Sequence, residues 1–284
     1  MRIVRATMAG EPINRADFEA YFRFSPAALA VREAVRLGEV RGIELAEPLL
    51  DVGCGDGLFA SLAYPGKQVW GIDINPVEVK RAQATASYAT LICGNVCTVD
   101  LPRAFFGGAI ANCSLEHVPG LPAALANVRR SLQPGALFVL IVPTPEWSRH
   151  LGMAELLATA GLKRLAVAYG DALDRVFNHV HLHDDSWWSD QLHDAGFDTI
   201  ESRRIVSRST SWIFEALLPS STLGWMVKRL TGRWIVAPSL RGPNSELTWN
   251  LVNRLYELFP DGTPEAAAEY LIVARCSERD PVAR

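Results

Sequence analysis

The sequence predicts an α/β fold in which a doubly wound, mostly parallel sheet carries an added helical cap. Two observations lead to this class. Short apolar runs alternate with helical patterns from residue 48 to residue 142, and a glycine-rich turn follows the first run. Strands that alternate with helices need crossover connections, which place a parallel sheet between two helical layers. Hydrophobic residues make up 49% of the 284 residues, enough for a sizeable core.

The elements of this region follow in order. Apolar runs predict strands at Pro48–Val52, Gln68–Asp73, Thr90–Cys93, Gly108–Cys113 and Ala136–Val142. Helical patterns occupy the gaps at 57–63, 76–88 and 121–132. Asn75 is a suitable N-cap for the second helix because Pro76 follows at its first position. The Pro134-Gly135 pair ends the third helix.

The flanking regions complete an arrangement of four parts. These are an N-terminal helical lid at 1–47, the core at 48–206, a helical, tryptophan-rich insertion at 207–265, and a final strand and tail at 266–284. Inside the core, a helix at 184–195 precedes a strand at 198–206. The last part holds a strand at Tyr270–Cys276.

Charge and cysteine content limit the class of protein. The formal net charge is −3, which argues against nucleic acid as a partner. The amino terminus lacks the apolar core of a secretory signal, and no run approaches the ~18 uncharged residues of a membrane span. The five cysteines lie in apolar, strand-like segments, which is typical of reduced thiols. The sequence therefore predicts a cytoplasmic protein.

The loop at 51–57 combines three glycines with two carboxylates, Asp51 and Asp56. Glycine lets the backbone turn sharply and approach a ligand closely. The loop follows the first strand, at the sheet edge where open α/β folds bind ligands. Its third glycine comes one residue earlier than in the dinucleotide fingerprint, and the carboxylates would repel a pyrophosphate. They suit a ligand with cationic amino and sulfonium groups.

A second carboxylate position supports this interpretation. Asp73 ends the second expected strand, 18 residues after Gly55. A carboxylate there can accept hydrogen bonds from ribose hydroxyls, and the adjacent Ile74 can offer an apolar face to a purine. The two elements together indicate an adenosine ligand without a diphosphate.

On these residues, the chain resembles the class I S-adenosylmethionine-dependent methyltransferases over 49–142, with weaker similarity to about residue 206. Five segments carry the resemblance: the glycine loop, Gly71-Ile72-Asp73, Asn112–His117, Leu132–Gly135 and His193–Phe197. The resemblance implies a Rossmann-like sheet of seven strands with the last one antiparallel. It also implies S-adenosyl-L-methionine lying across the ends of strands one to four.

The resemblance implies a set of cofactor-binding residues as well. They are Asp51, Gly53, Cys54, Gly55 and Gly57 for the methionine part, Asp73 and Ile74 for the ribose and adenine, Asn95 and Val96 for the adenine, and Asn112 at the border of the methionine. Asn95 stands where the family usually has an acidic residue. Its side-chain oxygen can still accept from the adenine amino group.

Methyl transfer from a sulfonium depends chiefly on positioning, and it needs a base only when the acceptor must lose a proton. His117, just past the fourth strand, is the candidate base. A structural role is the alternative, because the same residues recur in the family across acceptors of different chemistry.

Three alternating histidines, His179, His181 and His183, are candidates for the acceptor pocket. In an extended segment they would share one face. A structural role is one alternative, and a metal site is a disfavoured one, because Asp184 and Asp185 beside them are explained as helix caps. No metal is predicted.

Two aromatic segments bear on the acceptor. The cluster at 18–24, with Tyr21 as a candidate substrate contact, either folds over the acceptor or packs in a core. In the insertion, 212–236 mixes tryptophans and leucines with cations. This pattern favours a cap over a hydrophobic acceptor, with peripheral membrane contact or a dimer contact as alternatives.

The expected function is methyl transfer from S-adenosyl-L-methionine to a small, hydrophobic acceptor in small-molecule biosynthesis. An isoprenoid, a polyketide or a lipid-like intermediate would fit. A non-catalytic protein that binds S-adenosylmethionine is one alternative, and an NAD-type oxidoreductase is another. The glycine spacing and Asp51 argue against the oxidoreductase.

Overall fold

The computed structural model describes residues 13–85, 88–231, 235, 245–259 and 261–277, and it divides into two compact units. The first, here called the helical unit, consists of Met1–Gly42, Glu146–Phe177 and Arg204–Ala268. The second, here called the sheet unit, consists of Ile43–Pro145, Asn178–Arg203 and Glu269–Arg284. This division differs from the four predicted parts, because residues 146–177 belong to the helical unit and not to the expected core.

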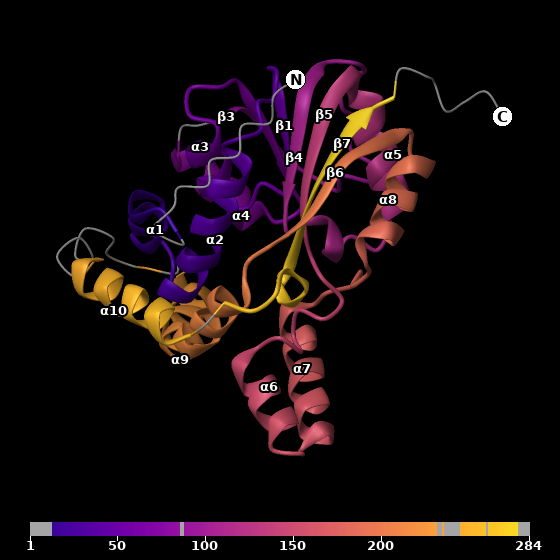
Figure 1. The fold of residues 1–284 in the computed structure, drawn as a ribbon. Coiled ribbons are helices and arrows are strands. Elements are labelled where there is room, and N and C mark those ends of the chain that lie inside the picture. Colours follow the sequence, from indigo (N-terminus) through magenta and orange to yellow (C-terminus); the bar gives the residue numbers. More distant parts are fainter. Residues whose placement is uncertain (1–12, 86–87, 232–234, 236–244, 260, 278–284) are drawn as a thin grey trace. The chain divides into compact units, whose positions relative to one another are not determined.

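The seven strands form one sheet in the order β3-β2-β1-β4-β5-β7-β6 (Figure 1). Their bounds are β1 Leu49–Val52, β2 Val69–Asp73, β3 Tyr88–Cys93, β4 Phe106–Asn112, β5 Leu132–Pro143, β6 Phe197–Ile205 and β7 Glu269–Cys276. The pairings β1–β2, β1–β4, β2–β3 and β4–β5 are parallel, and β5–β7 is antiparallel. The predicted seven-stranded, mostly parallel sheet with an antiparallel last strand is confirmed.

The described residues of the sheet unit form four α-helices, of which two begin at a side-chain cap. They are α3 Leu58–Ala63, α4 Pro76–Ala82, α5 Leu121–Ser131 and α8 Asp185–Asp194, with short 3₁₀ turns at Gln83–Thr85 and Leu115–His117. The Asn75 side chain accepts from the Val77 amide at 3.0 Å, and Asp184 does the same for Trp187 at 2.9 Å. Helix α4 ends earlier than predicted, since a 3₁₀ turn and then β3 follow it.

The core of the sheet unit lies where α5 and α8 cover one side of the sheet (Figure 1). Fully buried side chains from three elements meet there, namely Phe138 of β5, Leu125 of α5 and Trp188 of α8. Burial of such side chains contributes about 1.5–3 kcal/mol each before the entropy of folding is subtracted. This core therefore fixes the strand ends that carry the candidate site.

The helical unit is built from α1 Arg15–Phe22, α2 Ala27–Val40, α6 Gly152–Thr159, α7 Lys163–Phe177, α9 Arg208–Thr231 and α10 Ser245–Leu258. Its buried aromatic residues include Phe18 and Phe214, and the Arg32 guanidinium lies 4.7 Å from the Phe214 ring centroid. Asp17, buried in α1, pairs with Arg41 just after α2. Within the described residues, no helix combines the length and the apolar character needed to cross a bilayer.

Candidate active site

The glycine loop turns tightly at the carboxyl end of β1. The amides of Gly53 and Cys54 both donate to the Ile72 carbonyl, at 2.8 and 3.0 Å. Gly53 has φ +75°, and a Cβ there would lie 2.3 Å from Cβ of Ser114. Gly55 has φ +54°, and a Cβ there would meet no heavy atom within 4 Å. The loop is therefore closed against Ser114 on one side and borders open space at Gly55, as a ligand-binding turn requires.

Asp73 ties this loop to the end of β2. One carboxylate oxygen accepts from the Gly55 amide at 2.9 Å, and the other accepts from the Asn75 amide at 2.8 Å. Each carboxylate oxygen has a second lone pair, which is available to ribose hydroxyls. Ile74 next to it is 70% exposed, as a contact for an adenine face would be. These positions fit an adenosine ligand.

Asp51 is the second acidic group of the site, and it is almost completely buried. The Tyr88 hydroxyl donates to it at 2.6 Å. Burial raises the pKa of Asp51 to about 7; the Tyr88 hydrogen bond opposes this shift, and the charge of Asp73 adds to it. A ligand with an amino cation would favour the ionised form of Asp51. Sequence reasoning missed Tyr88 because it placed residue 88 at the end of the expected helix 76–88, whereas the structure places it at the start of β3.

Cys54 completes the loop as an inert side chain. Its thiol is buried, and burial followed by the charges of Asp51 and Asp73 raises its pKa. A thiol held in its neutral form is a poor nucleophile. Its place in the loop is therefore one of packing.

The remaining predicted cofactor residues differ in their surroundings. The Asn95 side-chain oxygen accepts from the Cys97 amide at 2.9 Å and forms a local turn. The Val96 side chain belongs to the core of the sheet unit, and its carbonyl accepts from the Asn127 side chain at 2.8 Å. Asn112 ends β4, opposite Ile141 of β5. All three lie on the loops and strand ends of the sheet unit.

His117 and the histidine segment, which the sequence treated separately, lie together. The His117 and His179 rings stack with centroids 5.4 Å apart. His117 Nδ1 lies 3.1 Å from the Asn178 carbonyl, and Nε2 lies 3.7 Å from the buried Glu116 carboxylate. If Nδ1 donates to the carbonyl, Nε2 carries the lone pair and can take up a proton.

The other two histidines have structural surroundings. His183 stacks on Trp187 with centroids 3.8 Å apart, and His181 stacks on the same ring at 5.6 Å. His181 Nε2 also lies 2.9 Å from the Val118 carbonyl. The segment therefore does not present three equivalent histidines, since only His179 accompanies His117.

One side-chain group could also hold a cation. The ligand atoms of Glu116, His117 and His179 all lie within 4.8 Å of one another. Two imidazoles and a carboxylate can bind zinc while leaving an open position. The absence of a metal stays a prediction, which chelation tests below.

The predicted acceptor residues of the helical unit lie in two environments. Tyr21 is buried, with its carbonyl accepting from the Ser25 hydroxyl at 2.8 Å. In the insertion, Phe214 and Leu217 are buried, while Trp212 borders a large apolar cavity. The side chains of 225–231, and the segments 232–234 and 236 on which the proposed membrane contact also rests, lie outside the described residues.

With this geometry established, the comparisons with known proteins identify the class. Residues 50–140 match the family described as Methyltransferase domain. This match and the strand order confirm a class I S-adenosylmethionine-dependent methyltransferase domain. The domain comprises the strands and loops that carry the glycine turn, Asp73 and His117.

Two curated relatives are similar to part of the chain. The chain is 39% identical over 133 residues to 24-methylenesterol C-methyltransferase 2 of Oryza sativa subsp. japonica, a match that covers 42% of this chain and 37% of that protein. It is 32% identical over 133 residues to squalene methyltransferase 1 of Botryococcus braunii, covering 43% and 34%. The chain thus matches little more than a third of these relatives' length.

A solved structure resembles more of the chain. The [4+2]-cyclase SpnF has a TM-score of 0.54 and 18% identity, and the likeness covers 87% of this chain and 80% of that one. Identity at this level shows a common fold only. The same fold thus occurs in a protein that is named as a cyclase, so the activity has to be argued from the site.

Proposed function

We propose that the protein transfers a methyl group from S-adenosyl-L-methionine to a small, hydrophobic acceptor. The observation that carries the donor assignment is the link from Asp73 to Gly55, which joins the ribose-binding carboxylate to the glycine loop. The acceptor class is supported by the curated relatives, whose names refer to a sterol and to squalene.

The donor supplies an electrophilic methyl group on a sulfonium; the acceptor bonds to that carbon while the sulfur keeps the electron pair of the broken bond. The task of the chain is to hold the two reactants in a near-attack arrangement. Asp51 and Asp73 would fix the donor by its amino group and its ribose. If the acceptor carries a proton, Nε2 of His117 would receive it.

The test is a transfer assay with donor labelled in its methyl group, in which labelled products are extracted into hexane. Sterol, polyprenyl and quinone acceptors form the first panel. Label in the organic phase that depends on active protein supports the proposal. Tight binding of the donor without transfer to any extract of the source organism would favour the non-catalytic alternative.

A further inference from the structure

The helical unit contains a large cavity bounded by α6, α7 and α9. Its volume is about 1390 Å³. This volume exceeds the about 300–1,000 Å³ that is usual for small-molecule pockets. All of its lining residues belong to the helical unit, so this unit alone defines the space.

Apolar side chains from each helix line this cavity. Leu156 comes from α6, Leu173 and Val176 from α7, and Leu218 from α9. Leu156 is 62% exposed and Val176 is 75% exposed. Large apolar side chains gathered in one hollow usually mark a binding surface. The walls therefore suit a hydrocarbon.

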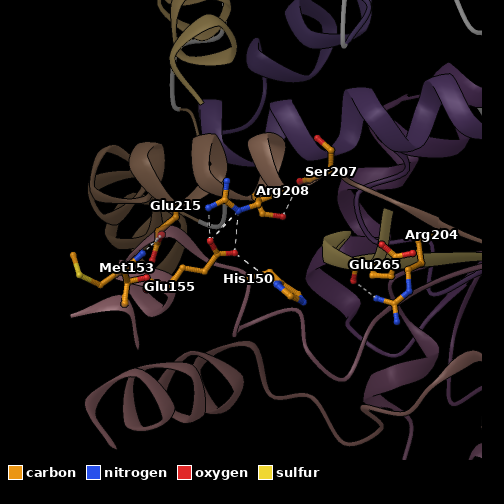
Figure 2. Close-up of polar contacts among 10 residues, drawn as sticks. His150, Met153, Glu155, Arg204, Ser207, Arg208, Glu215 and Glu265 are labelled. Atoms are coloured by element: carbon orange, nitrogen blue, oxygen red, sulfur yellow. Dashed lines mark hydrogen bonds and ion pairs between the residues drawn. The ribbon is translucent and has the colours of Figure 1, made fainter. Parts of the chain in front are cut away.

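The polar groups at the cavity border bind one another. Arg208 Nε donates to the Glu155 carboxylate at 2.8 Å, and the guanidinium lies 4.1 Å from the Trp212 ring centroid. Glu215 accepts from the Met153 amide at 2.9 Å and from the Tyr169 hydroxyl. Figure 2 shows Glu155 facing Arg208, and Glu215 beside Met153. These contacts join α6, α7 and α9 around the cavity.

The charge at the border selects against anionic ligands. Glu155 and Glu215 carry two negative charges against the one positive charge of Arg208. His150 Nδ1, 3.6 Å from Glu155, adds a positive charge only when protonated. A carboxylate or phosphate group entering the cavity would be repelled in an apolar surrounding, where such repulsion is strong.

We propose that this cavity binds the hydrocarbon chain of an uncharged acceptor, such as an isoprenoid or long-chain alcohol. The identity of the ligand as acceptor rests on the proposed function. Binding of the hydrocarbon chain is argued only from the apolar walls, the size of the cavity and the charge at its border.

Retinol, an uncharged isoprenoid alcohol, is a suitable probe because its fluorescence rises in apolar surroundings. It would be titrated into the full chain, and retinoic acid would serve as its anionic counterpart. The variants are Leu156→Gln and Val176→Gln in the cavity wall. Leu247→Gln is the matched control, since Leu247 of α10 is 72% exposed and does not line the cavity.

Retinol should bind with micromolar affinity, and retinoic acid at least fivefold more weakly. Each wall variant should weaken retinol binding at least fivefold, whereas the control should leave it unchanged. Equal binding of the two retinoids, or equal loss in the control, would overturn the inference. Binding of phosphatidylcholine vesicles without binding of free retinol would also overturn the inference, and it would assign the surface to a membrane.

Titration with S-adenosylmethionine, run in parallel, separates the two proposals. Donor binding and transfer to an acceptor without retinol binding would overturn this inference alone. Retinol binding that responds to the wall variants, in a chain that does not bind the donor, would support the cavity assignment and overturn the proposed function.

Discussion

Asp51 and Asp73 place two carboxyl groups beside the glycine loop, and their different surroundings give them different tasks. Asp73 accepts hydrogen bonds from two backbone amides, so its carboxylate shapes the loop in addition to its proposed part in ligand binding. Asp51 is buried and accepts a hydrogen bond from the Tyr88 hydroxyl. At this scale the two carboxyl groups suit the proposed cationic, ribose-containing ligand.

The raised pKa of Asp51 predicts a pH dependence of donor binding. Below its pKa of about 7 the group is protonated, and a bound amino cation favours the ionised form. Binding should therefore release a proton at pH 6, and affinity should rise toward pH 7.5 by up to ~10-fold per pH unit below the pKa. Calorimetry in buffers of different ionisation enthalpy measures this release. Asp51→Asn should abolish it, and an unchanged pH profile in this variant would contradict the assignment.

Replacing Asp73 should affect the donor more than the fold. Asp73→Ala removes acceptors for the ribose hydroxyls and for the Gly55 amide, and it should weaken binding of S-adenosylmethionine by about 1–3 kcal/mol. Asp100→Ala is the control, because the Asp100 side chain is 95% exposed in the same unit. Equal affinities of the two variants would remove Asp73 from the donor site.

We expect His117 to act as a base on the acceptor and not to bind S-adenosylmethionine. His117→Ala should lower turnover by about 10²–10⁴-fold for an acceptor that loses a proton, with the affinity for S-adenosylmethionine unchanged. A chelator such as EDTA should leave wild-type turnover unchanged. Loss of turnover on chelation, restored by zinc, would instead assign Glu116, His117 and His179 to a metal centre.

At the scale of elements, the strands from 49 to 142 could be predicted because each one is an apolar run closed by a turn signal. Helices α6 and α7 were not predicted. Apolar residues do recur there at helical spacing, as Tyr169, Leu173 and Val176 of α7 do, but these side chains line the cavity, and only Ala154 and Gly170 of the two helices are buried. The cavity follows from these two helices, and therefore it too escaped prediction.

The contacts between α6 and α9 should stabilise the helical unit. Arg208→Ala breaks a pair whose side chains are only 23% and 22% exposed, and it should lower the free energy of unfolding by about 1–2 kcal/mol. Arg15→Ala is the control, because Arg15 pairs with Glu19 at 48% and 33% exposure and should contribute little. Chemical denaturation compares them, and equal stability of the two variants would contradict the account.

At the scale of the molecule, the proposed donor site could be predicted from the sequence and the helical unit could not. The glycine loop follows β1, Asp73 ends β2 and His117 follows β4; these strands are neighbours in the sheet, so the alternating strand and helix pattern predicts that all three lie at one edge. The helical unit is assembled from three separate chain segments. Their association depends on contacts between residues far apart in sequence, such as Glu155 with Arg208, which no local pattern reveals.

The central claim is that the glycine loop and Asp73 form a site for S-adenosylmethionine. Calorimetric titration of the purified protein with S-adenosylmethionine, S-adenosylhomocysteine and NADH tests it most directly. We expect micromolar binding of the first two ligands and none of NADH, because Asp51 and Asp56 at the glycine loop would repel a diphosphate. Binding of NADH alone would contradict the donor assignment and the function built on it.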